Sequence, residues 1–197
     1  AQPATPASSQ PTAKDKAPDS AATPPEVVSR PVSVPLKRSG TALGGGTSLH
    51  LPEMAITFAR GLVLQAWVRP TTWLEGARIV ELGGPAGSAR IALLTTKSGG
   101  VELRWHDIRG DESHARMKGS LKEGTWSHVS AALIAGFVRF FVDGEEVPST
   151  DAPSSPGLPF AVSRAANFIG ESADKAVPRF SGAIADVRLW NRYDALD

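Results

Sequence analysis

Polar and aromatic side chains that could hold a ligand gather in one short segment, from Trp105 to Glu112. Within it, His106, Asp107 and Arg109 offer hydrogen-bond donors and acceptors in a run of low apolar content. A tryptophan at the end of a strand can stack on the apolar face of a sugar while neighbouring polar groups bind its hydroxyls. Trp105 has such a position, and packing of its ring toward the interior is the alternative.

Trp73 is a second tryptophan that could contact a ligand, because it follows a Pro-Thr-Thr turn. Three others, Trp67, Trp126 and Trp190, lie in apolar strand-like segments and are interpreted as framework residues. Loops and rims mounted on a rigid scaffold are where binding residues concentrate. The sequence therefore predicts a ligand-binding set of Trp73, Trp105, His106, Asp107 and Arg109.

The same segment contains the oxygen donors that could bind a metal ion, Asp107, Asp111 and Glu112, between His106 and His114. A solvated polar loop is the alternative interpretation, since ligand geometry does not follow from a loop sequence. No Asp-rich D-x-D-x-D-G calcium loop occurs in the chain.

Glycoside hydrolysis needs two carboxyl groups on one face, about 5 Å apart in retaining enzymes. Residues i and i+2 of a strand share a face, and no strand-like segment carries acids at that spacing. Glu145 and Glu146 are adjacent, and Asp111 and Glu112 lie in a predicted loop. A G-x-S-x-G nucleophile motif is also missing. The sequence therefore predicts no catalytic centre.

The elements that position these residues begin after a leader. Residues 1–33 are rich in Ala, Pro, Ser and Thr, and the first aromatic residue is Phe58. Such a composition buries too little apolar surface to offset the entropy of ordering the chain. We therefore predict a disordered, flexible Pro/Ala-rich linker at residues 1–33 and one folded domain at residues 34–197.

The domain consists of short alternating segments separated by Gly, Pro and Asp, which predict an all-β fold. The predicted strands are residues 61–70, 78–82, 90–94, 101–106, 126–134, 137–142, 145–147, 166–170 and 182–190. Asp143-Gly144 suits a tight primed hairpin turn. The spacing of about ten residues per strand favours a two-sheet antiparallel β-sandwich, or jelly roll, with one face of each strand buried.

Composition limits the partners. The 197 residues carry a formal net charge of +1 with scattered cations, which argues against a nucleic-acid partner. No apolar run approaches the roughly 18 residues of a membrane span, so no membrane insertion is expected. The chain has no cysteine, which excludes a disulfide scaffold and thiolate metal sites.

Five segments, in order, resemble the laminin G-like and concanavalin A-like jelly rolls of the lectin/glucanase superfamily. They are Gly61–Pro70, the G-x-W-x-H-V run Gly124–Val129, the V-D-G hairpin Phe140–Gly144, Phe168–Gly170, and the closing run Phe180–Arg192. Together they cover about residue 40 to the end. One departure concerns the closing run, where Ala185-Asp186 stands in place of the family's paired acids.

The resemblance implies a non-catalytic module that binds carbohydrate or a protein surface. It also implies a secreted or cell-surface location, further domains in a larger protein, and in some relatives a calcium ion at the rim. A spacer or docking domain of a large toxin or adhesin is the alternative function, and a glycan-active hydrolase is the less favoured one.

Overall fold

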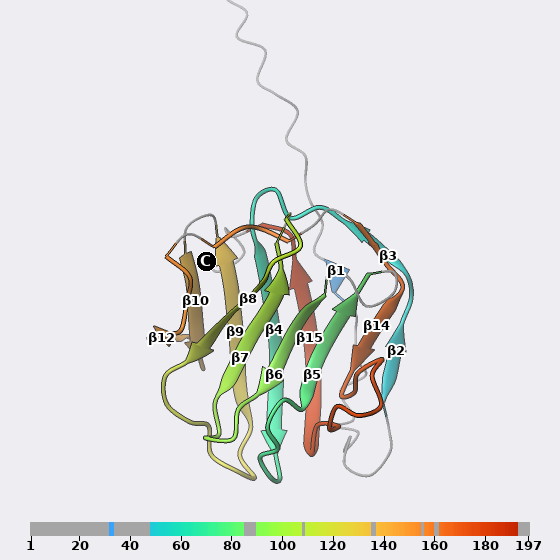
Figure 1. The fold of residues 1–197 in the computed structure, drawn as a ribbon. Coiled ribbons are helices and arrows are strands. Elements are labelled where there is room, and N and C mark those ends of the chain that lie inside the picture. Colours follow the sequence, from blue (N-terminus) through green and yellow to red (C-terminus); the bar gives the residue numbers. More distant parts are fainter. Residues whose placement is uncertain are drawn as a thin grey trace, which may run out of the picture.

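The described residues fold into strands joined by turns (Figure 1). The computed structural model describes residues 32–33, 48–84, 90–107, 109–134, 137–154, 156–159 and 162–192. Every strand pairing in these residues is antiparallel, as predicted. They contain no helix with the length and apolar character needed to span a lipid bilayer.

The first layer is a six-stranded sheet with the order β1-β15-β4-β9-β10-β11. Its strands are β1 (Val32–Ser33), β15 (Gly182–Trp190), β4 (Leu62–Pro70), β9 (Ser127–Ile134), β10 (Phe137–Val142) and β11 (Glu145–Val147). The turn between β10 and β11 has positive φ at Asp143 (52°) and Gly144 (89°). This conformation confirms the predicted primed turn.

The second layer is a seven-stranded sheet with the order β12-β8-β7-β6-β5-β14-β2. Its strands are β12 (Ser149–Thr150), β8 (Glu112–Met117), β7 (Val101–His106), β6 (Ile91–Thr95), β5 (Arg78–Gly83), β14 (Ala166–Ile169) and β2 (Leu49–Leu51). A two-stranded sheet joins β13 (Val162–Arg164) to β3 (Met54–Ile56). Figure 1 shows the seven-stranded sheet in front of the six-stranded one.

The core lies between the two layers, and alternation decides which side chains enter it. From β4, the side chains of Leu62, Leu64, Ala66 and Val68 are buried there. In the second half of the strand, the residues that alternate with them are exposed or half-buried. From β7, the core receives Val101, Leu103 and Trp105, so the ring of Trp105 takes the inward alternative rather than the predicted ligand-binding position. Full burial of one such side chain contributes about 1.5–3 kcal/mol.

Two boundaries differ from the predictions. Val32 and Ser33, the last two residues of the predicted linker, pair with Leu189 and Arg188 of β15. Strand pairing thus reaches into the predicted linker, and residues 1–31 lie outside the described residues. Glu112 was predicted in a loop, but it is the first residue of β8, whose core contacts come from Ala115 and Met117.

Candidate ligand-binding site

We call the predicted ligand-binding segment, Trp105 to Glu112, the rim. It forms the hairpin between β7 and β8, and its carboxylates are bonded to groups of the same hairpin. Asp107 is almost fully buried, and its Oδ1 accepts the backbone N–H groups of Arg109 (2.8 Å) and Asp111 (3.1 Å). Its Oδ2 accepts the Arg109 side chain at 3.2 Å. Burial raises the pKa of Asp107, but these donors outweigh it and hold the pKa below its usual value. The charged carboxylate therefore stabilises the turn.

The predicted calcium ligands do not fit a calcium ion in this arrangement. The Arg109 guanidinium lies beside both Asp107 and Asp111, at 3.2 and 3.7 Å. Glu112 faces Arg104 at 3.8 Å and His106 at 3.9 Å. Calcium prefers a shell of six to eight oxygens rather than cations. Among the described residues, no three acidic, histidine or cysteine side chains converge as a metal site.

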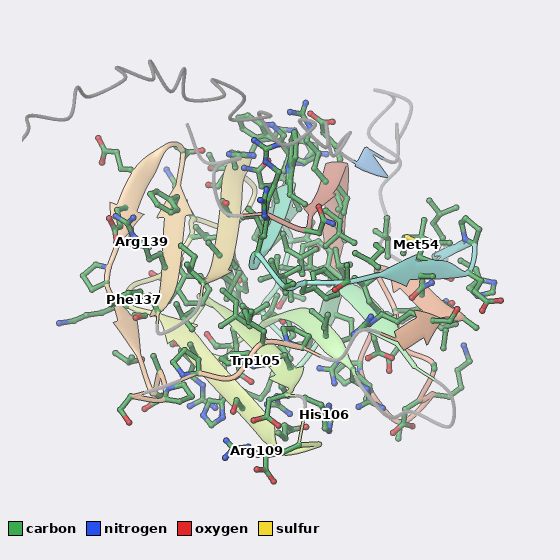
Figure 2. All side chains as sticks on the ribbon, turned by 90° about the horizontal axis from the view of Figure 1, so that it is seen from above. Met54, Trp105, His106, Arg109, Phe137 and Arg139 are labelled. Carbon is green, nitrogen blue, oxygen red and sulfur yellow. The ribbon has the colours of Figure 1, made fainter. Side chains whose placement is uncertain are left out.

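The two predicted ligand-binding tryptophans are not brought together with the rim. Trp105 is fully buried, and its Nε1–H donates to the carbonyl of Gly157 at 2.8 Å, so its ring does not face solvent. Figure 2 shows it toward the middle of the sandwich, whereas His106 and Arg109 lie at the margin. Trp73 is half-buried and lies against Gly99, in the turn before β7, at the opposite end of that strand. Ligand contact by Trp73, His106 and Arg109 stays a prediction.

A different site opens on the outer face of the six-stranded sheet. It is a cleft of about 440 Å³, and we call it the Trp67 cleft. The residues lining it are Trp67, His128, Asp143, Gly144, Asp186 and Arg188. They come from β4, β9, the β10–β11 turn and β15, which are neighbours in the sheet.

Trp67 provides the apolar wall of this cleft. Because Ala66 and Val68 point into the core, Trp67 points outward, and 39% of its surface is exposed. His128 is its partner on β9, and the two rings lie 5.3 Å apart with a tilt of 45°. An indole held in this way offers a flat apolar surface to a ligand.

Asp143 is fixed by the strand beside it. Its backbone N–H donates to the carbonyl of His128 at 2.8 Å, and its Oδ1 accepts the His128 backbone N–H at 2.7 Å. These two bonds hold the β10–β11 turn against the start of β9. The carboxylate consequently has a defined place at the mouth of the cleft.

A β-bulge in β15 supplies the remaining wall. The register between β15 and β4 shifts between Ala185 and Arg188, and Asp186 has a φ of 49°. The extra residue lets Val187 enter the core while Asp186 and Arg188 line the cleft. Arg188 Nη2 lies 2.8 Å from Asp186 Oδ2, and both side chains remain close to half exposed.

The imidazole of His128 is neutral at pH 7. Its partial burial lowers the pKa below the ordinary value of 6.5, and the positive charge of Arg188 lowers it further. Asp143 and Asp186 act in the opposite direction with smaller effect. At neutral pH His128 therefore contributes hydrogen-bonding groups to the cleft but no charge.

Two carboxylates also share the outer face of the seven-stranded sheet, which the search for acids on a single strand missed. Glu102 on β7 accepts Arg104 Nε at 2.8 Å and Arg116 Nε at 2.7 Å. Glu81 on β5 accepts Arg78 Nε at 2.9 Å and the Ser172 hydroxyl. Both glutamates are fully buried beneath these partners. Neither is placed to donate a proton to a substrate or to attack one.

Sequence reasoning missed the cleft because it assigned Trp67 to the framework. Alternation could have shown that Trp67 points outward, since Leu64, Ala66 and Val68 occupy the inward positions of the same strand. Every residue lining the cleft also falls within one of the segments that resemble the laminin G-like family. The missing information was that these segments meet at one place.

Two antiparallel sheets with this strand order, packed on a shared core, define a jelly-roll β-sandwich. The Laminin_G_3 model, described as the concanavalin A-like lectin/glucanases superfamily, matches residues 43–195. The chain belongs to this superfamily, as the sequence resemblance predicted. A comparison with curated protein sequences gives no significant match.

Solved structures with the same fold include sugar-binding and laminin domains. Domain 4 of AbnA, an extracellular arabinanase from Geobacillus stearothermophilus solved with arabinotriose, is 18% identical with a TM-score of 0.58. The match covers 81% of this chain and 74% of that one. Mouse laminin α1 LG4-5 is 17% identical with a TM-score of 0.58, over 78% and 41% of the two chains. The CBM40 module of a Ruminococcus gnavus sialidase, bound to α2,3-sialyllactose, is 12% identical with a TM-score of 0.53, over 79% and 97%.

Proposed function

We propose that the chain is a non-catalytic recognition module that binds a glycan through the Trp67 cleft. The observation that carries this proposal is the exposed indole of Trp67 in a cleft whose other walls are polar. Sugar recognition needs such an apolar platform together with side chains that bind hydroxyl groups. Asp143 and Asp186 provide acceptors, and Arg188 provides donors.

One further observation supports binding without turnover, and a second supports binding of a sugar. The buried glutamates Glu81 and Glu102 are fully engaged by arginine and serine side chains. The ligands of two structural neighbours, arabinotriose and sialyllactose, are sugars, and the modules that hold them share this fold. We further propose an extracellular or cell-surface setting within a larger protein, as is usual for modules that bind external glycans.

A glycan array probed with the full chain tests the proposal, followed by calorimetry with the best ligand. Trp67→Ala is expected to weaken binding about two- to thirteen-fold, because stacking on an aromatic ring is worth roughly 0.5–1.5 kcal/mol. Phe137→Ala is the matched control: Phe137 is also exposed on the six-stranded sheet but does not line the cleft.

Arg109→Ala, in the same experiment, tests the rim predicted from sequence. Loss of binding in Arg109→Ala but not in Trp67→Ala would move the site to the β7–β8 hairpin. No binding to any glycan would reject the proposal in favour of a spacer or docking role. Shortening of the bound oligosaccharide during incubation would contradict the absence of catalysis.

A further inference from the structure

The charges in the Trp67 cleft do not balance. Its lining contains two carboxylates, Asp143 and Asp186, and one guanidinium, Arg188. Arg188 is already paired with Asp186, through Nη2 at 2.8 Å and Nε at 3.3 Å. Among the described residues, no cation forms an ion pair with Asp143. Two negative groups and one positive group leave one net negative charge in the cleft.

His128 does not cancel this charge at neutral pH. Its burial and the nearby Arg188 lower its pKa, so the ring stays neutral. Oδ1 of Asp143 is held by the backbone N–H of His128, and it is the second carboxylate oxygen that is left for a ligand. The uncompensated charge therefore lies beside the flat face provided by Trp67.

A negative charge beside an exposed indole is a favourable setting for an ammonium group. A cation near an aromatic face is attracted by the ring quadrupole, and a carboxylate adds a direct charge interaction. An acidic sugar would meet like charge in the same place. We propose that the cleft selects a sugar bearing a protonated amine over the same sugar bearing a hydroxyl or an acetamide. This inference rests on the proposed function, in which Trp67 stacks on a sugar.

Three oligosaccharides with the same backbone isolate the effect of the ligand's charge on its affinity. Pentamers of β-1,4-linked glucosamine, glucose and N-acetylglucosamine differ only in the group at carbon 2. Calorimetry with the full chain and with His128→Gln, whose side chain carries no charge at any pH, is expected to give about five-fold tighter binding of the glucosamine pentamer in both at a mildly acidic pH where the amine is protonated. That factor corresponds to one exposed charge pair with a cation–π contact. The preference should shrink in high salt because exposed charges are screened.

Asp143→Asn is the decisive variant. Asparagine keeps the acceptor for the His128 N–H and tolerates the φ of 52°, but it removes the charge. The ratio of glucosamine-pentamer to glucose-pentamer affinity is expected to fall to about one, and this ratio, rather than either affinity alone, reports the removed charge. Asp151→Asn is the matched control, an exposed aspartate with a φ of 58° beside Arg116, outside the cleft. It should leave the preference intact.

The outcomes separate the two proposals. Equal affinity of the wild-type chain for the glucosamine and glucose pentamers overturns the charge selection, while loss of both in Trp67→Ala still supports glycan binding. An amine preference that survives in Asp143→Asn also overturns it. Failure of all three pentamers to bind overturns this inference, and failure across the wider array overturns the proposed function.

Discussion

The function of an aspartate in this domain depends on the donors that surround it. Asp107 lies within a segment rich in polar residues, yet two backbone N–H groups and a guanidinium occupy its carboxylate. Asp143 lies in a two-residue turn that looked purely structural, and one of its oxygens remains available at the cleft. Residue type and local polarity alone do not distinguish these two cases.

His128 should make the domain less stable in mild acid. Its pKa in the folded state lies below the ordinary 6.5, so the unfolded chain takes up a proton first as the pH falls. Stability is therefore lost as the pH drops below about 6.5, toward the lower folded pKa. His128→Gln removes this proton uptake, and urea unfolding between pH 7.5 and 5.5 is expected to show a flatter dependence than in the wild type.

The ring itself can be followed by NMR. The imidazole resonance that is absent from His128→Gln identifies His128 in the wild-type spectrum, and its titration midpoint should lie below 6.5. A midpoint above this value, or identical pH dependence of unfolding in the two proteins, would contradict the prediction.

Two small irregularities in regular strands build the cleft. The bulge in β15 turns Asp186 and Arg188 toward it, and the primed turn after β10 brings in Asp143. The bulge lies beside the second half of β4, which carries Trp67, and the turn lies on the far side of β9 from β4. The register between these strands is therefore a condition for the site as well as for the core.

Gly182 is critical to that register. It pairs with Pro70, has a φ of 145°, and a Cβ there would lie 2.2 Å from the carbonyl oxygen of Arg69. Because the clash is with backbone, Gly182→Ala is expected to cost at least about 2 kcal/mol in the free energy of unfolding. Gly124→Ala is the control, with a φ of 71° and no atom within 4 Å, and should cost about 1 kcal/mol. Equal losses in urea titrations would contradict this account.

The sequence predicted the long strands because alternation and turn residues are local signals. β7, β10, β11 and β15 begin and end at the predicted residues. The other two- and three-residue strands, β1, β2, β3, β12 and β13, were missed, since their pairing partners lie far away in the chain, as with β2 and β14. β8 was missed because the run Glu112–Met117 places only two apolar side chains in the core. The cleft was missed for a related reason, since it depends on four strands meeting.

The two outer faces of the molecule differ in character. On the seven-stranded sheet, Glu81 binds Arg78 of its own strand, and Glu102 binds Arg104 of its own strand and Arg116 of the neighbouring β8. These arginines cover both carboxylates. On the six-stranded sheet, an exposed indole and a cleft remain open. Breaking a buried, fully bonded charge pair costs much free energy. We therefore expect the ligand to bind on the outer face of the six-stranded sheet.

The start of the folded domain can be located by truncation. β1 pairs with Leu189 and with Arg188, a residue of the cleft. A chain beginning at residue 34 loses these ladder bonds and is expected to be less stable by about 1 kcal/mol, which lowers Tm by about 3 °C. A chain beginning at Val32 keeps the pairing and serves as the control in calorimetry. Equal melting temperatures would show that β1 adds nothing to the domain.

The strands at the margins of both sheets are short in the part of the chain that the structure describes. β1 and β12 have two residues each, and β11 and β2 have three. An unpaired strand edge is a template on which another chain can add, and brevity limits how many backbone bonds such an addition could form. β11 also places two glutamates on its edge. Copies of this domain crowded side by side should therefore resist joining their sheets into aggregates.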